Sequence, residues 1–398
     1  MNRSGEKYEE LVEVGEDAVK MGRSSAGHLV TRRHPDEAAG RTRDGTGGES
    51  GRIIASGVAV GQDITIADPS GTKKTSKDRG LPSPHLQRLP PPPPPPPPSE
   101  PEDGLCKEGI VALTYATHSG KDDKFCRAVE SAIQHGVPLR ILGWGEEWKG
   151  LTQKLEGSLK ALRSLPPSCT VVFTDAYDVL YSDNLSTIKS KFSSLGEPVL
   201  FAGECGCWPQ ITRDNGVGSV CLNDYPTSPT PYRYLNSGQW IARADKALEI
   251  FEALIGEAKT YAMRYHVPVS KINDQEMVSD MYMDGRFGIK LDHRNEIFQA
   301  MHATYKFPLE RCDPWPELQN RGGVWENKVY GTSPSIFHFN GGNMAHYVDV
   351  ESQMWYKKKG KKRGRGMDGK DLGEVTLQVG DRDGKHVKYK DLCPNTPR

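Results

Sequence analysis

The sequence predicts an α/β fold in which helices cover both faces of a mostly parallel sheet. From residue 110 onward, short apolar runs alternate with amphipathic segments, which is the pattern of a doubly wound sheet. The run at 170–174 is apolar and rich in β-branched residues, as in a strand buried on both faces. It is followed by two acids, Asp175 and Asp178, and ligands bind at the carboxyl ends of strands in such sheets. One stretch therefore predicts both the fold class and the place of the site.

The first elements set the strand-helix-strand order. A strand is expected at 110–116, a helix at 122–135, a strand at 138–142, a helix at 151–165 and the central strand from 169. Gly136 ends the first helix, and two prolines stop the second. Because successive parallel strands need crossover connections, this order favours right-handed strand-helix-strand units.

The later elements are less regular. Strands are expected at 198–202 and 234–242, helices at 244–263 and 276–283, and further strand segments at 289–292, 296–299 and 335–341. Residues 210–232 have the composition of an irregular excursion, and 335–341 is interpreted as the last strand. The triplet Asn236-Ser237-Gly238 inside a strand predicts either a close approach of backbone to a ligand or a bulge.

The two ends of the chain differ from this region. Residues 1–104 are rich in Gly, Ser and charged side chains and hold only short apolar runs, so we expect disorder there. The proline run at 90–98 predicts a stiff linker, or a ligand for a proline-recognition module. We place the folded domain at 105–356 and a basic, flexible tail at 357–398. The tail could bind a polyanion, serve as a localisation signal or simply be a solvated segment.

The acid pair predicts a metal site. Two carboxylates after one strand repel each other unless a cation lies between them, and Mg²⁺ or Mn²⁺ takes such oxygen ligands. His338, near the tip of the strand at 335–341, offers a neutral imidazole as a third ligand. Taken by themselves, Asp175 and Asp178 could instead be helix or turn caps, and His338 a satisfied half-buried histidine. A dehalogenase-type phosphatase has one residue between its acids rather than two, and a calcium loop needs denser acids and a glycine.

Composition and motifs limit the other classes. Lys+Arg and Asp+Glu both number 52, which argues against a general nucleic-acid binder. No GxGxxG or Walker sequence is present, so a diphosphate needs another partner, such as a metal. We see no apolar stretch of membrane-span length, and residues 1–30 lack the apolar core of a signal peptide.

Eight cysteines in 398 residues do not predict a disulfide framework, and their spacing fits no zinc site. Asn184-Leu185-Ser186 forms a glycosylation sequon, a sequence that chance often supplies.

An ordered series of motifs from about residue 109 to 347 resembles the glycosyltransferase domain of the procollagen-lysine hydroxylase/glycosyltransferase family. The motifs are Leu113-Thr114-Tyr115-Ala116-Thr117, Leu142-Gly143-Trp144-Gly145-Glu146-Glu147-Trp148-Lys149-Gly150, Gln153-Lys154, Thr174-Asp175-Ala176-Tyr177-Asp178-Val179-Leu180, Cys207-Trp208-Pro209, Leu235-Asn236-Ser237-Gly238, Asp274-Gln275, Leu291-Asp292-His293-Arg294, Ile297-Phe298-Gln299 and His338-Phe339-Asn340-Gly341. Their number and order make the resemblance specific.

The resemblance implies a GT-A fold that binds a UDP-hexose through Mn²⁺, with Asp175, Asp178 and His338 as ligands. It implies that Tyr177 stacks on uracil and that Thr117 contacts the nucleoside. It implies transfer of galactose or glucose to hydroxylysine or galactosyl-hydroxylysine of a collagen-like acceptor, and it suggests the lumen of the endoplasmic reticulum or Golgi.

The remaining candidate residues concern the diphosphate, the sugar and the acceptor. By the same resemblance, Asp274 lies near the transferred sugar and Trp208 borders the acceptor pocket. We further expect Lys154, Asn340 and Gly341 to line the site for UDP.

Three departures from the family pattern bear on activity. The family's acidic run is reduced to Asn273-Asp274, and Gly342-Asn343-Met344 replaces its Pro-Thr-Lys. No iron-binding His-x-Asp set follows, so lysine hydroxylation is not expected. The leading interpretation is a metal-dependent UDP-sugar transferase, and the alternative is a non-catalytic sugar- or protein-binding module with the same fold.

Overall fold

The computed structural model describes residues 104–209, 220–304, 312–341, 344–357, 371–380 and 384–395, together with Arg365 and Gly369. The predicted disordered region up to residue 103, its proline run, and most of the basic run at 357–365 lie outside these residues. No helix in the described ranges has both the length and the apolar character needed to cross a membrane.

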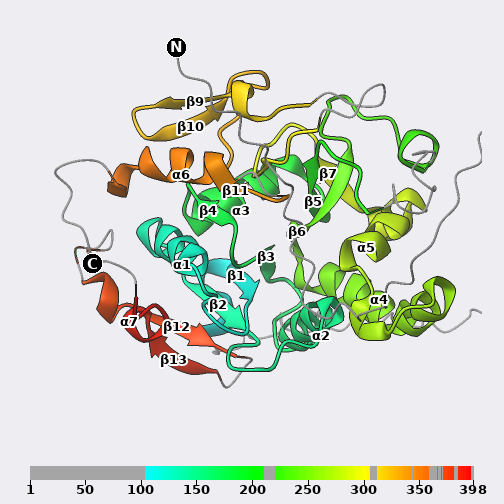
Figure 1. Ribbon diagram of the computed structural model, residues 1–398, viewed down its shortest axis with the longest axis horizontal. Coiled ribbons are helices and arrows are strands. Elements are labelled where there is room, and N and C mark those ends of the chain that lie inside the picture. The colour runs from blue at the N-terminus through cyan, green and yellow to red at the C-terminus, as the bar shows by residue number, and fades with distance from the viewer. Residues whose placement is uncertain are drawn as a thin grey trace, which may run out of the picture. The chain divides into compact units, whose positions relative to one another are not determined.

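The core is an eight-stranded sheet in the order β13-β12-β2-β1-β3-β6-β5-β7 (Figure 1). Its strands are β1 (Ile110–Tyr115), β2 (Leu139–Leu142), β3 (Thr170–Thr174), β5 (Val199–Glu204), β6 (Tyr234–Arg243), β7 (Lys290–Asp292), β12 (Thr376–Val379) and β13 (Lys385–Lys388). β1 pairs in parallel with β2 and β3, and β5 pairs in parallel with β7. β6 runs antiparallel between β3 and β5. The predicted α/β class with a mostly parallel sheet is confirmed.

Helices cover both faces because the strands are apolar on both. The helices are α1 (Lys124–Gln134), α2 (Leu151–Leu162), α3 (Leu185–Leu195), α4 (Ala244–Tyr265), α5 (Asp274–Met283), α6 (Met344–Ser352) and α7 (Tyr389–Leu392). Leu113 of β1 shares an apolar cluster with α2, α4 and α5, whereas its neighbour Ala112 shares one with α1, α3 and α7. This alternation is expected of strands, whose successive side chains point to opposite faces.

A smaller sheet carries the chain back toward the end of β3. It has the order β4-β11-β8, from β4 (Val179–Tyr181), β8 (Phe298–Ala300) and β11 (Ile336–His338). β4 is antiparallel to β11, with His338 opposite Val179. A separate hairpin joins β9 (Leu318–Arg321) to β10 (Val324–Asn327). The small sheet thus places residues about 160 positions apart in sequence side by side.

The pairing of β5 with β6 is interrupted by a bulge. Phe201 pairs with Trp240, but the next residue, Ala202, pairs with Asn236. The stretch from Ser237 to Gln239 is therefore extra on β6, and it turns its backbone toward the end of β3. The predicted bulge at Asn236-Ser237-Gly238 is confirmed. The carbonyl of Gly238 accepts a hydrogen bond from the Asp175 amide at 2.7 Å, and the approach of this backbone to a ligand stays a prediction.

The prediction of a flexible tail from residue 357 is wrong for 371–380 and 384–395. β12 pairs with β2 and extends the sheet, β13 follows as a hairpin, and β11 is not the last strand. The basic run dominated the composition of this segment. Yet Leu377 and Val379 alternate with polar residues and are buried, which is a strand signal of period two.

The expectation that the cysteines form no disulfide framework is also wrong. All eight are paired, as Cys106–Cys169, Cys126–Cys393, Cys205–Cys312 and Cys207–Cys221. Their separations in sequence are 63, 267, 107 and 14 residues, so only the folded chain brings most partners together. The second bond ties α1 to the segment just after α7 and anchors the C-terminal hairpin.

Candidate functional site

A cavity of about 410 Å³ opens at the carboxyl end of β3, beside the β6 bulge. It is lined by eight of the predicted site residues: Lys154, Asp175, Asp178, Trp208, Asp274, His338, Asn340 and Gly341. In open α/β sheets this edge is where ligands bind. The fold therefore brings most of the predicted residues into one site.

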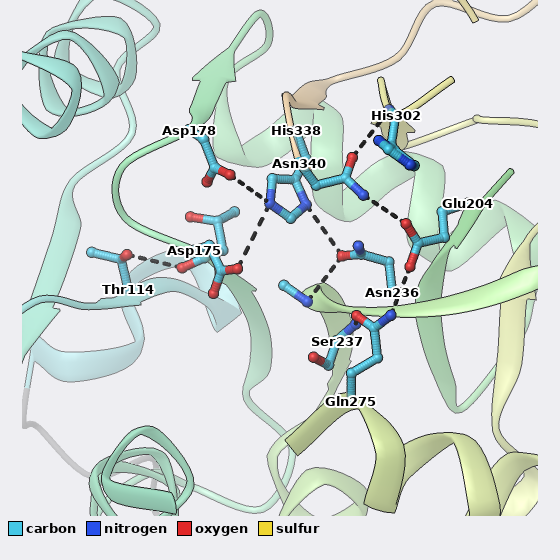
Figure 2. Close-up of polar contacts among 12 residues, drawn as sticks. Thr114, Asp175, Asp178, Glu204, Asn236, Ser237, Gln275, His302, His338 and Asn340 are labelled. Atoms are coloured by element: carbon cyan, nitrogen blue, oxygen red, sulfur yellow. Dashed lines mark hydrogen bonds and ion pairs between the residues drawn. The ribbon is translucent and has the colours of Figure 1, made fainter. Parts of the chain in front are cut away.

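Asp175, Asp178 and His338 converge on one point of this cavity (Figure 2). Asp175 follows β3, Asp178 precedes β4, and His338 ends β11. The Nε2 atom of His338 lies 3.3 Å from Oδ2 of Asp178 and 3.7 Å from Oδ2 of Asp175. Neither acid caps a described helix, since α3, the next helix, is capped by Asn184.

The orientation of His338 is fixed from behind. Its Nδ1 lies 3.1 Å from Oδ1 of Asn236, which accepts a hydrogen bond from a ring N–H there and leaves Nε2 facing the carboxylates. A neutral imidazole held in this way presents a lone pair for a metal. Gly238 provides the space, because a Cβ there would lie 2.4 Å from Cε1 of His338 and 2.5 Å from Oδ2 of Asp175.

The negative charges of Asp175 and Asp178 favour a cation between them. Burial lowers the pKa of His338, but Asp178 and Asp175 more than offset this and raise it. Burial likewise raises the pKa of Asp178, but His338 more than offsets this and lowers it. The two carboxylates thus favour positive charge at the position that His338 Nε2 faces. One imidazole nitrogen and two carboxylates, with ligand atoms within 4.8 Å of one another, fit a divalent ion such as Mn²⁺.

Lys154 on α2 joins this cluster to the opposite side of the cavity. Its Nζ lies 3.1 Å from Oδ1 of Asp175 and 2.7 Å from Oδ2 of Asp274. Burial lowers the pKa of Lys154, yet the two carboxylates raise it above its ordinary value. The lysine is therefore a fixed positive charge within the cavity.

Asp274 is the first residue of α5 but does not cap it. The cap is Asn273, whose side chain accepts a hydrogen bond from the Glu276 amide at 3.3 Å. The Asp274 carboxylate instead accepts one from Ser237 Oγ at 3.0 Å and pairs with Lys154. Its side chain is thus held toward the cavity.

Glu204, which was not among the predicted site residues, ends β5 and lines the same cavity. Its carboxylate accepts hydrogen bonds from Nε2 of Gln275 at 2.7 Å and from Nδ2 of Asn340 at 2.6 Å. Burial raises the pKa of Glu204 to about 7, although both hydrogen bonds act in the opposite direction. Asp175 was predicted because it is an acid at the carboxyl end of a buried strand. Glu204 has the same position at the end of β5, so the same signal could have identified it.

His302 is a second residue that was missed. Its ring fills space left by Gly341 and Gly206, where an added Cβ would lie 2.3 Å from Nδ1 and 3.1 Å from Cδ2 of the imidazole. Its backbone amide donates to Oδ1 of Asn340 at 3.2 Å. Gly341 therefore shapes the cavity wall by leaving room for a neighbouring side chain.

Two predicted residues lie outside the lining of this cavity. Tyr177 donates its hydroxyl to the carbonyl of His118 at 2.8 Å, and its ring centroid is 6.0 Å from that of Phe125. The carbonyl of Thr117 accepts a hydrogen bond from the Gly145 amide at 2.9 Å. Both lie around the loop after β1. Trp208, by contrast, lines the cavity with its side chain 51% exposed.

The sequence of this domain matches a known family. A family model described as the PLOD GT domain matches residues 106–360. Procollagen-lysine,2-oxoglutarate 5-dioxygenase of Drosophila melanogaster is 30% identical over 246 residues, which cover 58% of this chain and 30% of the relative. Multifunctional procollagen lysine hydroxylase and glycosyltransferase LH3 of Homo sapiens is 26% identical over 267 residues, 64% of this chain and 32% of the relative. The chain thus spans about a third of these relatives.

Among solved structures, a galactosyltransferase LgtC in complex with donor and acceptor sugar analogs superposes with a TM-score of 0.36 at 11% identity. The superposition covers 63% of this chain and 98% of that one. Mouse xyloside xylosyltransferase 1 superposes with a TM-score of 0.34 at 15% identity, over 58% of this chain and 97% of that one.

Proposed function

The chain belongs to the PLOD glycosyltransferase-domain family, and from this premise we propose that it is a metal-dependent glycosyltransferase that uses a UDP-hexose. Its fold is of the GT-A type, with a mostly parallel sheet in which β6 runs antiparallel to both of its neighbours. The observation that supports the proposal most directly is the convergence of Asp175, Asp178 and His338 in the cavity. Asn340 and Gly341 line the same cavity, as expected of a binding site for UDP.

The residues around the candidate metal site can bind the diphosphate and nucleoside of a UDP-sugar donor. When bound, Mn²⁺ would neutralise negative charge on the departing diphosphate. Lys154 adds a second positive charge, since its Nζ is buried between two acids that keep it protonated. Tyr177 and Thr117 lie around the loop after β1, where an aromatic ring and a polar group can hold uracil and ribose.

Residues on the other side of the cavity can contact the transferred sugar and the acceptor. Asp274, held by Ser237 and Lys154, would orient a sugar hydroxyl or stabilise positive charge that develops on the sugar. Glu204 has a pKa of about 7, which suits a group that takes the proton from an attacking hydroxyl. Trp208, half exposed, offers an apolar surface on which an acceptor can rest.

The name of a relative supports a proposal for the acceptor class. The human relative is named for procollagen lysine hydroxylation and glycosyl transfer, so we propose hydroxylysine or galactosyl-hydroxylysine in a collagen-like chain as acceptor. The test is release of UDP with Mn²⁺, from UDP-galactose and UDP-glucose, with and without hydroxylysine peptides. Acceptor-dependent release that chelation abolishes is expected. Binding of UDP-sugars with no release under any of these conditions would favour the non-catalytic module.

A further inference from the structure

The sequon at Asn184-Leu185-Ser186 occupies an exposed helix cap. The Oδ1 atom of Asn184 accepts hydrogen bonds from the Thr187 amide at 2.9 Å and from Ser186 Oγ at 2.7 Å. Within the described part of the chain, no residue accepts a hydrogen bond from its Nδ2. The cap therefore uses one half of the side-chain amide and leaves the other half exposed for a substituent.

A second cavity, of about 400 Å³, begins at this asparagine. Its walls include Asn184, which caps α3, Ser186 of α3, Thr376 and Gln378 of β12, and His386 of β13. The wall combines polar with apolar side chains, and its size is within the range of small-ligand pockets. It also includes Ile110, the first residue of β1. Because β1 and β3 are parallel, this cavity lies at the end of the sheet opposite the metal cluster.

The disulfides indicate the kind of compartment in which the protein folds. All eight cysteines are paired, and such a set of bonds forms in oxidising compartments rather than in a reducing cytosol. In a protein that passes through such a compartment, an Asn-x-Ser sequence on the surface is an acceptor for N-linked glycans. Neither the proposed transfer reaction nor the metal site explains this sequon or this cavity.

We propose that Asn184 is an N-glycosylation site whose innermost sugar lies in the cavity between α3 and the β12–β13 hairpin. In the modification, Nδ2 forms a bond to C1 of an oligosaccharide carried on a lipid diphosphate. The lipid diphosphate leaves with the bonding electron pair, and Nδ2 loses one proton. Oδ1 remains free to cap α3.

This placement has a mechanical consequence. The C-terminal hairpin joins the sheet through one residue pair between β12 and β2, Val379 with Ile141. The disulfide Cys126–Cys393 links the segment after this hairpin to α1. A sugar ring between Asn184 and Gln378 or His386 adds polar contacts between α3 and this hairpin. The glycan is therefore expected to stabilise the hairpin without reaching the catalytic cavity.

The first experiment tests the modification. The full chain, fused to a cleavable secretion leader, is produced in insect cells, and tryptic peptides are mapped by mass spectrometry. We expect a glycan on the peptide that contains Asn184, lost in Ser186→Ala and kept in Ser186→Thr. Mapping separates it from any glycan at the other sequon, Asn2-Arg3-Ser4. A secreted protein with its disulfides formed and a bare Asn184 peptide would overturn the proposal.

The second experiment tests the cavity. An endoglycosidase that leaves one N-acetylglucosamine is compared with a peptide amidase that removes the whole glycan and converts Asn184 to Asp. We expect the single sugar to retain the melting temperature, and complete removal to lower it by about 2–4 °C. Asn184→Asp, which keeps the cap, is the matched control and should equal the stripped protein. Equal melting temperatures for trimmed and stripped protein would show that the sugar does not occupy the cavity.

Discussion

The two walls of the catalytic cavity handle charge differently. We call Asp175, Asp178 and His338 the metal wall, and Glu204, Asp274 and Gln275 the acid wall. On the metal wall the three side chains face one another directly, and Lys154 also pairs with Asp175. On the acid wall each carboxylate accepts hydrogen bonds from neighbours, Glu204 from Gln275 and Asp274 from Ser237.

The difference shows what each wall needs. Two carboxylates that converge on an imidazole favour a bound cation, whereas carboxylates that accept hydrogen bonds from amides and hydroxyls are held in a fixed position. We therefore expect substitutions on the metal wall to abolish metal-dependent binding, and substitutions on the acid wall to slow transfer while leaving binding largely intact.

The largest effect is expected from Asp178→Asn. Loss of one charged ligand should weaken Mn²⁺-dependent UDP binding by roughly 100-fold or more, while the fold is retained because Asp178 does not cap a described helix. Isothermal titration with Mn²⁺ and UDP measures this, with thermal melting alongside.

Asp292→Asn is the matched control, because Asp292 also ends a strand but accepts three backbone N–H bonds, from Glu296, Ile297 and Phe298. It should lower the melting temperature and leave Mn²⁺ affinity unchanged. If the two variants exchanged these phenotypes, the assignment of the metal wall would be wrong.

The next largest effect is expected from Glu204→Gln. A proton acceptor of this kind contributes about 10²–10⁴-fold, so turnover should fall at least 100-fold with little change in UDP affinity. Wild-type turnover should rise with pH through an apparent pKa at or below about 7, and the variant should lose this rise. A variant with the wild-type pH profile would remove Glu204 from the reaction.

Stability gives a second measurement on Glu204. Because the pKa of Glu204 is about 7 in the folded protein against 4.5 for an ordinary glutamate, the folded state binds more protons between these values. The free energy of unfolding of metal-free protein should therefore fall as pH rises from about 4.5 to 7, by roughly 2–4 kcal/mol from this group. Glu204→Gln should show no such contribution in urea unfolding.

The metal wall was predictable from sequence in large part, whereas on the acid wall Asp274 was predicted only through the family resemblance and Glu204 was not predicted. Asp175 and Asp178 follow a strand with a clear β pattern, and His338 ends another. Glu204 ends a comparable strand, β5. Its hydrogen-bond partner Gln275 is 71 residues away, and no local sequence pattern links the two residues. Asn236, which orients His338, is 102 residues from it. Spacing in the sequence shows where strands end but not which ends meet.

The same limit explains the errors in the peripheral parts. The disulfide partners are as far as 267 residues apart, so counting cysteines could not pair them. β12 and β13 are four residues each in a Gly- and Lys-rich context, and their pairing to the sheet is visible only in three dimensions.

An intermediate effect is expected from Asp274→Asn. Asparagine keeps an acceptor for Ser237 Oγ but removes the charge that faces Lys154. Sugar transfer to a hydroxylysine peptide should fall about 10-fold or more, with Mn²⁺-dependent UDP affinity within a few-fold of wild type. Unchanged transfer with the same acceptor would leave Asp274 with a structural role.

The smallest and most discriminating effect concerns Lys154, which contacts both walls. Lys154→Met retains length and removes the charge, so Asp175 no longer has a cation 3.1 Å from its Oδ1. Because that cation repels a divalent ion bound to the same carboxylate, Mn²⁺ affinity in the absence of UDP should rise a few-fold. In the presence of UDP the effect should reverse, since the diphosphate loses a positive partner. Lys154→Arg, which keeps the charge, should show neither change.

Stability separates the two contacts of Lys154. Its removal leaves Asp274, only 5% exposed, without a cation, and an unpaired buried charge is costly. Lys154→Met should therefore lower the melting temperature, and Lys154→Met combined with Asp274→Asn should recover most of the loss. A fall in Mn²⁺ affinity in Lys154→Met would mean instead that the lysine holds Asp175 in its liganding position. The two walls would then be one unit, in which the acid wall positions the metal wall through this single side chain.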